Sequence, residues 1–253
     1  MTERAPTYAA AQVRAAERPL LDAGEPLMRR AASALASVMR RELADAVGPR
    51  ILVLAGSGDN GGDALFAAAG IGDVAQIDVH LMSDRRHEAG LSAALAAGAR
   101  LIDADAAVDR ISRYALVVDG ILGIGASPDP ALRGAAREVV SRLLAAGGDR
   151  MPRTIAVDLP SGLHPDTGAA DDVVLPAAMT VTFGAVKAGL ATGRGLELAG
   201  DIVLVDLGLG PGLADEEPTG AASVTLAPVP TRRHSRAVCE STAPAAPPPR
   251  YLA

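Results

Sequence analysis

The stretch GSGDNGGD at residues 56–63 combines glycines with acidic and amide side chains, directly after the apolar run ILVLA. Its glycines have the spacing G-x-G-x-x-G, at Gly56, Gly58 and Gly61. A glycine loop that leads into a helix presents backbone N–H groups to a phosphate. Backbone N–H groups alone suffice to bind a phosphate. The polar side chains of Asp59, Asn60 and Asp63 therefore predict a second role for this loop. For Asp63 taken alone, we expect capping of the helix that follows.

A second group of side chains offers oxygen ligands to a cation. Asn60, Asp119 and Ser161 each carry a hard oxygen atom, and each follows a different apolar run. Such ligands suit hard cations, with backbone carbonyls and water completing the coordination. The residues predict a cation site without specifying the ion.

Asp158 and Lys187 are the candidates for acid-base chemistry. Asp158, in the segment AVDLPSG, ends an apolar run, where partial removal from water raises the pKa of a carboxyl group toward neutral pH. Lys187 is the only lysine in the chain and offers a compact charge for a phosphate or a carboxamide. The alternatives are structural: an aspartate that caps the following turn, and a lysine that is solvated in a turn.

Alternating strands and helices must position these groups. Short runs rich in β-branched residues predict six strands, at 51–55, 75–82, 115–121, 154–160, 179–185 and 201–209. Apolar positions at helical spacing predict helices at 9–22, 26–45, 63–70, 88–97 and 131–146. The alternation is typical of an α/β fold with a mostly parallel sheet. Because the polar groups follow the strands, we expect them in one cleft at the carboxyl ends.

The composition excludes several classes of partner. A formal net charge of -6, a sequence pI of about 5.2 and only 2% aromatic residues argue against binding of nucleic acid. A single cysteine, Cys239, cannot form an internal disulfide. The first residues lack the apolar core of a signal peptide, and no run is long enough to cross a bilayer. We therefore expect a cytoplasmic protein without a membrane partner.

The domain organisation follows from a shift in composition. Residues 1–212 carry the strand and helix pattern, whereas residues 213–253 are rich in proline and alanine and end in APAAPPPRYLA. Such a segment buries too little apolar surface to order itself. We predict one domain over 1–212 and a disordered tail over 213–253.

Four motifs in order resemble the YjeF N-terminal domain family, the NAD(P)H-hydrate epimerases. They are GSGDNGGDALFAAAGI, VVDGILGIG followed by ALRG, AVDLPSGLHPDTG and TFGAVKAGL, and the resemblance runs from about Tyr8 to about Leu209. It implies a Rossmann-like three-layer α/β/α sandwich that interconverts the R and S forms of hydrated NADH and NADPH, a repair of damaged nicotinamide nucleotides. It also implies a bound potassium ion and a homodimer.

The resemblance assigns roles to individual residues. Asn60, Asp119 and Ser161 match the potassium ligands of the family. The substrate-binding positions fall on two loops and on Asp158: Asp59, Asn60, Gly61, Gly62 and Asp63 in the first loop, and Gly123, Ile124, Gly125, Ala126, Ser127, Pro128 and Asp129 in the second. As a hypothesis, Asp158 assists loss of the C6 hydroxyl as water, and Lys187 holds the substrate or stabilises charge.

The sequence departs from the family pattern in two places. The family reads N-N-G-G-D-G where this chain has Asp59 to Ala64, so an amide is replaced by a carboxylate and a glycine by an alanine. The added negative charge is expected to favour a cation and to disfavour substrate phosphates. Many bacterial relatives carry a second, C-terminal dehydratase domain, and the segment from Val229 starts somewhat like one before it becomes low in complexity. We expect a truncated fusion that works with a separate NAD(P)H-hydrate dehydratase.

Two other functions fit parts of the sequence. A non-catalytic nucleotide-binding or interaction protein could share the fold, although such a protein would be free to lose the polar set. An ordinary NAD-dependent dehydrogenase rests on the glycine spacing alone and needs an acidic residue about 20 positions further on, at Asp78 or Asp84. The histidines, including His164 near the predicted cleft, are expected to have structural or solvated roles.

Overall fold

A computed structural model describes residues 2–125 and 129–229 of the chain. Within these residues, ten strands form one sheet in the order β4-β3-β2-β5-β6-β7-β9-β10-β1-β8. The six predicted strands are all present: β2 (Arg50–Ala55), β3 (Gln76–Leu81), β5 (Leu116–Gly120), β6 (Arg153–Val157), β7 (Met179–Phe183) and β9 (Asp201–Val205). Neighbouring strands of this set pair in parallel; in the β2–β5 pair, for example, Leu52 lies opposite Val117. The predicted α/β fold with a mostly parallel sheet is confirmed.

Four strands were not predicted from the sequence: β1 (Thr2–Tyr8), β4 (Arg100–Leu101), β8 (Val186–Lys187) and β10 (Gly220–Ala227). β10 pairs in parallel with β9 and antiparallel with β1, which in turn contacts β8. The boundary of the predicted disordered tail at 213 is therefore wrong, because Ala222, Val224 and Ala227 of β10 are buried in the sheet. The rest of the predicted tail, 230–253, lies outside the described residues.

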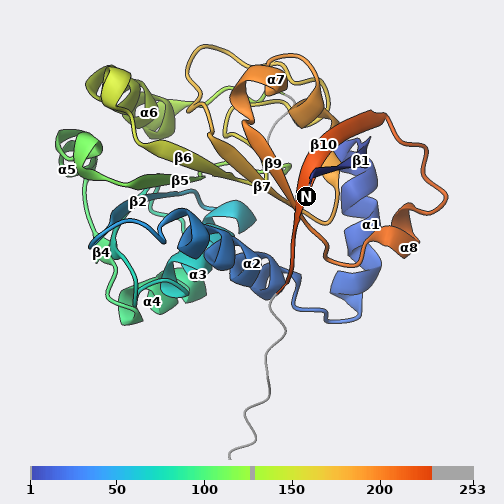
Figure 1. Ribbon diagram of the computed structural model, residues 1–253, viewed down its shortest axis with the longest axis horizontal. Coiled ribbons are helices and arrows are strands. Elements are labelled where there is room, and N and C mark those ends of the chain that lie inside the picture. The colour runs from blue at the N-terminus through green and yellow to red at the C-terminus, as the bar shows by residue number, and fades with distance from the viewer. Residues whose placement is uncertain (1, 126–128, 230–253) are drawn as a thin grey trace, which may run out of the picture.

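Helices cover both faces of the sheet (Figure 1). α2 (Leu27–Glu42), α3 (Asp59–Ala69) and α4 (Glu88–Ala96) lie on one face, and α5 (Ala104–Asp109) and α6 (Gly134–Gly147) lie on the other. α1 (Ala10–Asp22), α7 (Gly195–Leu198) and α8 (Gly210–Leu213) surround the end near β1 and β10, and short 3-10 turns occur at Ile111–Arg113, Gly148–Arg150 and Ala188–Ala191. The predicted helices are present with shifted ends; α3 begins at Asp59 rather than at 63.

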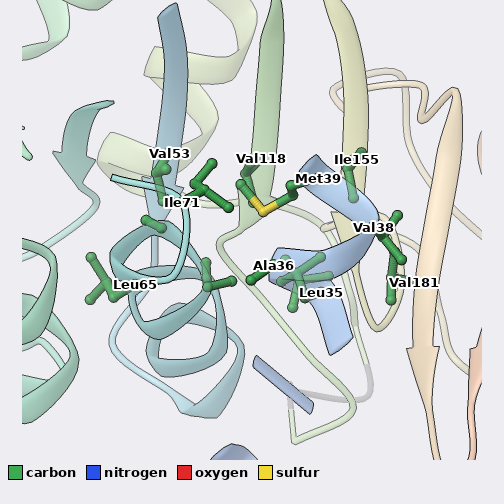
Figure 2. Close-up of a cluster of buried hydrophobic side chains, with 14 of the residues drawn as sticks. Leu35, Ala36, Val38, Met39, Val53, Leu65, Ile71, Val118, Ile155 and Val181 are labelled. Atoms are coloured by element: carbon green, nitrogen blue, oxygen red, sulfur yellow. The ribbon is translucent and has the colours of Figure 1, made fainter. Parts of the chain in front are cut away.

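The core explains why the strands read as continuous apolar runs. Along β2, Val53 points to the face covered by α2 and α3, whereas Leu52 and Leu54 point to the face covered by α5 and α6. Figure 2 shows Leu35 and Met39 of α2 against strand residues of the first face. Burial of each such side chain stabilises the fold by about 1.5–3 kcal/mol relative to exposure. Both faces of the central strands are therefore mostly apolar, and the predicted site residues lie beyond the strand ends.

Candidate active site

The predicted polar residues meet at the carboxyl ends of β2, β5 and β6, in the centre of the sheet. The chain reverses its direction of travel across the sheet between β2 and β5, which is where open α/β sheets bind ligands. A cavity of about 200 Å³ lies there. Its polar lining is Glu17, Asp59, Asn60, Asp63 and Asp158, and its apolar lining includes Leu27, Met28, Ile124 and Phe183.

The glycine loop is shaped by close backbone packing. A Cβ atom on Gly56 would lie 1.9 Å from the carbonyl oxygen of Ile121, and one on Gly61 would lie 2.1 Å from the carbonyl oxygen of Gly56. Gly58, by contrast, has open space around it and immediately precedes α3. Two of the three glycines of the G-x-G-x-x-G spacing are therefore required by close packing. Gly56 packs against the residue that follows β5, and Gly61 packs against Gly56 within the loop. Asp59, exposed in the first turn of α3, carries a charge that favours the helix N-terminus.

Asp63 does not cap a helix, so the expectation from the sequence is wrong. Because α3 begins at Asp59, Asp63 lies one turn inside the helix, and its side chain is buried against the cavity. Its Oδ1 has no hydrogen-bond partner among the described residues. Burial raises the pKa of Asp63 well above its ordinary value, and the charges of Asp158, Asp59 and Glu17 raise it further. This environment favours the protonated form of the carboxyl group more than water does.

Asn60, Asp119 and Ser161 form a connected buried cluster. Ser161 donates its N–H and its hydroxyl to the Asp119 carboxylate, at 2.9 and 2.6 Å. The Asn60 amide donates to the carbonyl oxygens of Leu122 (2.9 Å) and Val157 (2.5 Å). Burial raises the pKa of Asp119, and the hydrogen bonds from Ser161 and Ile121 partly oppose this rise. Within 2–125 and 129–229, no basic side chain forms an ion pair with this carboxylate.

Asp158 and Lys187 form a buried ion pair. Asp158 follows β6 with a φ of 69°, a left-handed conformation that non-glycine residues seldom adopt. Its Oδ1 accepts hydrogen bonds from the Lys187 ammonium group, from the Thr182 hydroxyl (3.1 Å) and from the Phe183 N–H (3.2 Å). The Lys187 side chain is only 1% exposed and also donates to the Phe183 carbonyl oxygen at 2.8 Å.

This ion pair decides between the alternatives left open by the sequence. The solvated-turn interpretation of Lys187 is wrong, since the side chain is buried. Within the described residues, the Asp158 carboxylate accepts hydrogen bonds from groups of β7 and β8 and not from the turn that follows it. The predicted burial of Asp158 is confirmed, and its carboxylate lies beside the Lys187 ammonium group.

The second predicted loop is only partly described. Ala126, Ser127 and Pro128 lie outside the described residues. Gly123 packs on the first loop so closely that a Cβ atom there would lie 2.3 Å from Asn60 Oδ1. Ile124 lines the cavity, and its carbonyl oxygen accepts a hydrogen bond from Arg14 of α1 at 2.7 Å. Asp129 instead forms a surface ion pair with Arg133 at 2.7 Å.

Sequence reasoning missed Glu17, which α1 brings to the cavity from the other end of the sheet. Burial raises the pKa of its carboxyl group, and Lys187 partly offsets this effect. The one signal in the sequence is an acidic residue beside the buried face of an amphipathic helix, next to Val13 and Ala16. That pattern fits most surface helices and does not by itself indicate a site.

The dehydrogenase alternative is not supported by the positions of its acidic residues. Asp78 is buried within β3, where it accepts hydrogen bonds from Arg50 (3.1 Å), Arg110 (3.4 Å) and the Tyr114 hydroxyl (2.9 Å). The carboxylate that would bind a ribose hydroxyl in a dehydrogenase is therefore already hydrogen-bonded within the protein. Asp84 is exposed in the turn after β3.

The described histidines have structural roles, as expected. The His87 ring accepts a hydrogen bond from the Gly90 N–H at 3.0 Å and so caps α4. The His164 ring accepts from the N–H groups of Asp166 (3.1 Å) and Thr167 (3.3 Å). Neither residue lines the cavity.

Comparison with known proteins gives a consistent result. The family model described as "YjeF-related protein N-terminus" matches residues 24–189. An NAD(P)H-hydrate epimerase of Microbacterium testaceum is 55% identical over 226 residues, which cover 89% of this chain and 87% of that protein. A bifunctional NAD(P)H-hydrate repair enzyme, Nnr, of Mycobacterium tuberculosis is 43% identical, and the match covers 80% of this chain but 41% of that enzyme.

A solved structure shares the fold. The crystal structure of yeast ynu0, YNL200c, superimposes with a TM-score of 0.64 over 75% of this chain and 85% of the yeast chain. The sequence identity is 18%, so this likeness concerns the arrangement of strands and helices. In the part of the chain that the structure describes, no helix is long and apolar enough to cross a membrane.

Proposed function

The chain belongs to the family of YjeF-related protein N-termini, and we infer that it is an isomerase, an NAD(P)H-hydrate epimerase, which interconverts the R and S forms of hydrated NADH and NADPH. One observation carries this conclusion: the chain is 55% identical to an epimerase along 87% of that enzyme's length. The cavity at the strand ends is lined by the buried acids Asp63 and Asp158, and Lys187 forms an ion pair with Asp158, so these groups are suited to the chemistry. The activity repairs damaged nicotinamide nucleotides.

The reaction needs a proton at the hydroxyl group and a fixed position for the ring. In the hydrate the hydroxyl group is on C6, next to the ring nitrogen. Once the hydroxyl group is protonated, the lone pair of this nitrogen can expel it as water. Asp158 is the catalytic carboxyl group of this proposal, and the ion pair with Lys187 fixes its position. The apolar side chains of Met28, Ile124 and Phe183 line the same cavity and would exclude bulk water from the ring.

The two loops hold the rest of the dinucleotide in this proposal. Residues 59–63 supply the first helical turn of α3, and residues 123–129 supply the second loop. Asp59 places a carboxylate at the position where the family pattern N-N-G-G-D-G has an amide. Its negative charge disfavours phosphate groups nearby. We expect Asp59→Asn to lower the KM for the NADPH hydrate, which carries an additional phosphate, more than the KM for the NADH hydrate.

We propose that Asn60, Asp119 and Ser161 hold a potassium ion. The fit rests on Asp119, a fully buried carboxylate that no basic side chain pairs with in the described ranges and that accepts hydrogen bonds from Ser161. Leu122 joins Asn60 to this pair, because its carbonyl oxygen accepts from the Asn60 amide and its N–H donates to the Ser161 hydroxyl. Hard oxygen ligands of this kind suit an alkali cation. When bound, the ion would supply positive charge that compensates Asp119 and draws the two substrate loops together.

Three further features are proposals. A homodimer and a cytoplasmic location follow from the resemblance and from the sequence. Coupling to a separate dehydratase follows from the chemistry, because epimerisation alone only exchanges two damaged forms and a second enzyme must remove water from one of them. The relationship to bifunctional repair enzymes supports such coupling.

An epimerisation assay tests the function. Purified protein is given the R form of the NADH hydrate in potassium or in sodium buffer, and the S form is followed by chromatography against the spontaneous rate. We expect acceleration that is greater in potassium and that is absent in Asp158→Ala. Asp172→Ala, which removes a carboxylate from a fully exposed side chain, is the matched control and keeps the wild-type rate. A wild-type rate no faster than the spontaneous one would leave a binding protein on the same fold.

A further inference from the structure

Two buried carboxyl groups face the cavity in contrasting environments. The Oδ1 of Asp158 accepts three hydrogen bonds, one of them from the Lys187 ammonium group. The Oδ1 of Asp63 is buried and has no hydrogen-bond partner in the part of the chain that the structure describes. Two carboxyl groups whose surroundings favour opposite protonation states are the arrangement that divides acid and base roles in an active site.

Three carboxylates around Asp63 act in the same direction. Asp59 lies on the same helix, Glu17 reaches the cavity from α1, and Asp158 follows β6; all three carboxylates disfavour a charge on Asp63. Lys187 is the opposing cation, and it is already bound to Asp158.

The remaining residues that line the cavity carry no charge. The cavity residues of α2 are apolar, namely Leu27, Met28 and Ala31. His87 of the loop before α4 packs on Phe66 and lies against Gly62, on the neighbouring side of α3. Burial therefore dominates, and the pKa of Asp63 is raised well above its ordinary value.

We propose that Asp63 is the catalytic acid that protonates the departing C6 hydroxyl, and that Asp158 is the base that accepts a proton from the water that returns. The proposal rests on the epimerase function and assigns its two proton transfers to separate residues. It changes the role expected of Asp158 from its sequence alone, since the Lys187 ammonium group is bound to the Asp158 carboxylate.

The proposed step is balanced in atoms and electrons. The proton of Asp63 moves to the hydroxyl oxygen, the C6–O bond breaks, water leaves, and the lone pair of the ring nitrogen forms the N=C6 bond. Water then adds to the other face of C6, its proton moves to Asp158, and the electron pair returns to nitrogen. The proton passes from Asp158 back to Asp63 through the water of the cavity, and the reverse reaction uses the two groups in exchanged roles.

The test compares Asp63→Asn with the wild type over a range of pH. Asparagine keeps the shape of the side chain and removes the acidic proton. We expect kcat to fall by about 10²–10⁴-fold while KM changes little. The wild-type rate should decline as the pH rises through the pKa of Asp63, because the protonated form is the active one, and the residual rate of Asp63→Asn should lack this decline. Asp73→Asn, an exposed carboxylate paired with Arg40 beyond the end of α3, is the matched control and should keep the wild-type rate.

Each outcome is distinguishable. An active wild type together with an Asp63→Asn rate within a few-fold of it overturns the assignment, as does a loss confined to KM. If Asp63→Asn does not fold, a wild-type kcat that stays constant or rises over the alkaline range overturns it independently. An inactive wild type would instead refute the proposed epimerase function itself.

Discussion

Replacement of Lys187 by methionine should destabilise the fold strongly, because it leaves a buried carboxylate without its cation. The side chains of Lys187 and Asp158 are 1% and 7% exposed, so water cannot replace the lost partner. Removal of one member of a buried ion pair costs about 3–5 kcal/mol. For a domain of this size, this cost corresponds to a decrease in Tm of roughly 2–4 °C for each kcal/mol.

Asp158→Asn should be destabilising for the complementary reason. It leaves the Lys187 ammonium group with the Phe183 carbonyl oxygen (2.8 Å) and the Thr182 hydroxyl (3.3 Å), which are neutral acceptors. The double variant Asp158→Asn/Lys187→Met removes both charges and keeps the approximate volume. We therefore expect it to be less destabilised than the sum of the single variants by about 3 kcal/mol or more.

Urea denaturation of the wild type, the two single variants and the double variant at neutral pH measures this coupling. The m values should agree, so that differences in midpoint report differences in the free energy of unfolding. Single variants that each cost less than about 1 kcal/mol, or costs that simply add in the double variant, would refute the reasoning.

Three further predictions concern the loop, the buried acid and the unpredicted strand. Gly123→Ala should lower the epimerisation rate by about 10–100-fold, because a Cβ atom 2.3 Å from Asn60 Oδ1 displaces that side chain; a normal rate in the chromatographic assay would contradict this. Asp63→Asn should gain stability over the wild type as the pH rises, since the folded wild type holds its proton to a higher pH than the unfolded chain does. The gain should be about 1.4 kcal/mol per pH unit between the ordinary and the raised pKa of Asp63, and a pH-independent difference in urea denaturation would refute it. Val224→Asp in β10 should cost about 3 kcal/mol in thermal or urea unfolding, whereas Ser223→Asp, an exposed neighbour, should cost little; equal effects would show that β10 does not belong to the core.

The central strands could be predicted because their sequences are determined by burial on both faces. ILVLA and ALVVDGI are nearly continuous apolar runs, and they became β2 and β5. The strands at the other end of the sheet carry no such signal. β1 contains Arg4 and Pro6 and exposes its first three residues, and β10 consists largely of small residues after a polar segment. Their order depends on pairing between the two ends of the chain, which the local sequence does not encode.

The candidate site was predictable where a motif follows a strand. Asn60, Asp119, Asp158 and Ser161 are adjacent to strand ends, and the parallel sheet brings those ends together. Contacts between distant segments could not be predicted in the same way. The Asp158–Lys187 ion pair depends on the pairing of β7 with β6 and on the position of β8, and the approach of Glu17 depends on where α1 packs. The role of Asp63 was predicted wrongly because the predicted start of α3 was one helical turn too late.

The most direct test of the account is the rate at which the double variant Asp158→Asn/Lys187→Met forms the S hydrate from the R hydrate, beside the wild type. The variant is expected to fold, so its activity reports on the two groups and not on the loss of structure. We predict clear acceleration over the spontaneous reaction by the wild type and the spontaneous rate alone for the variant. A folded double variant that epimerises the hydrate at the wild-type rate would contradict the placement of the reaction in this cavity.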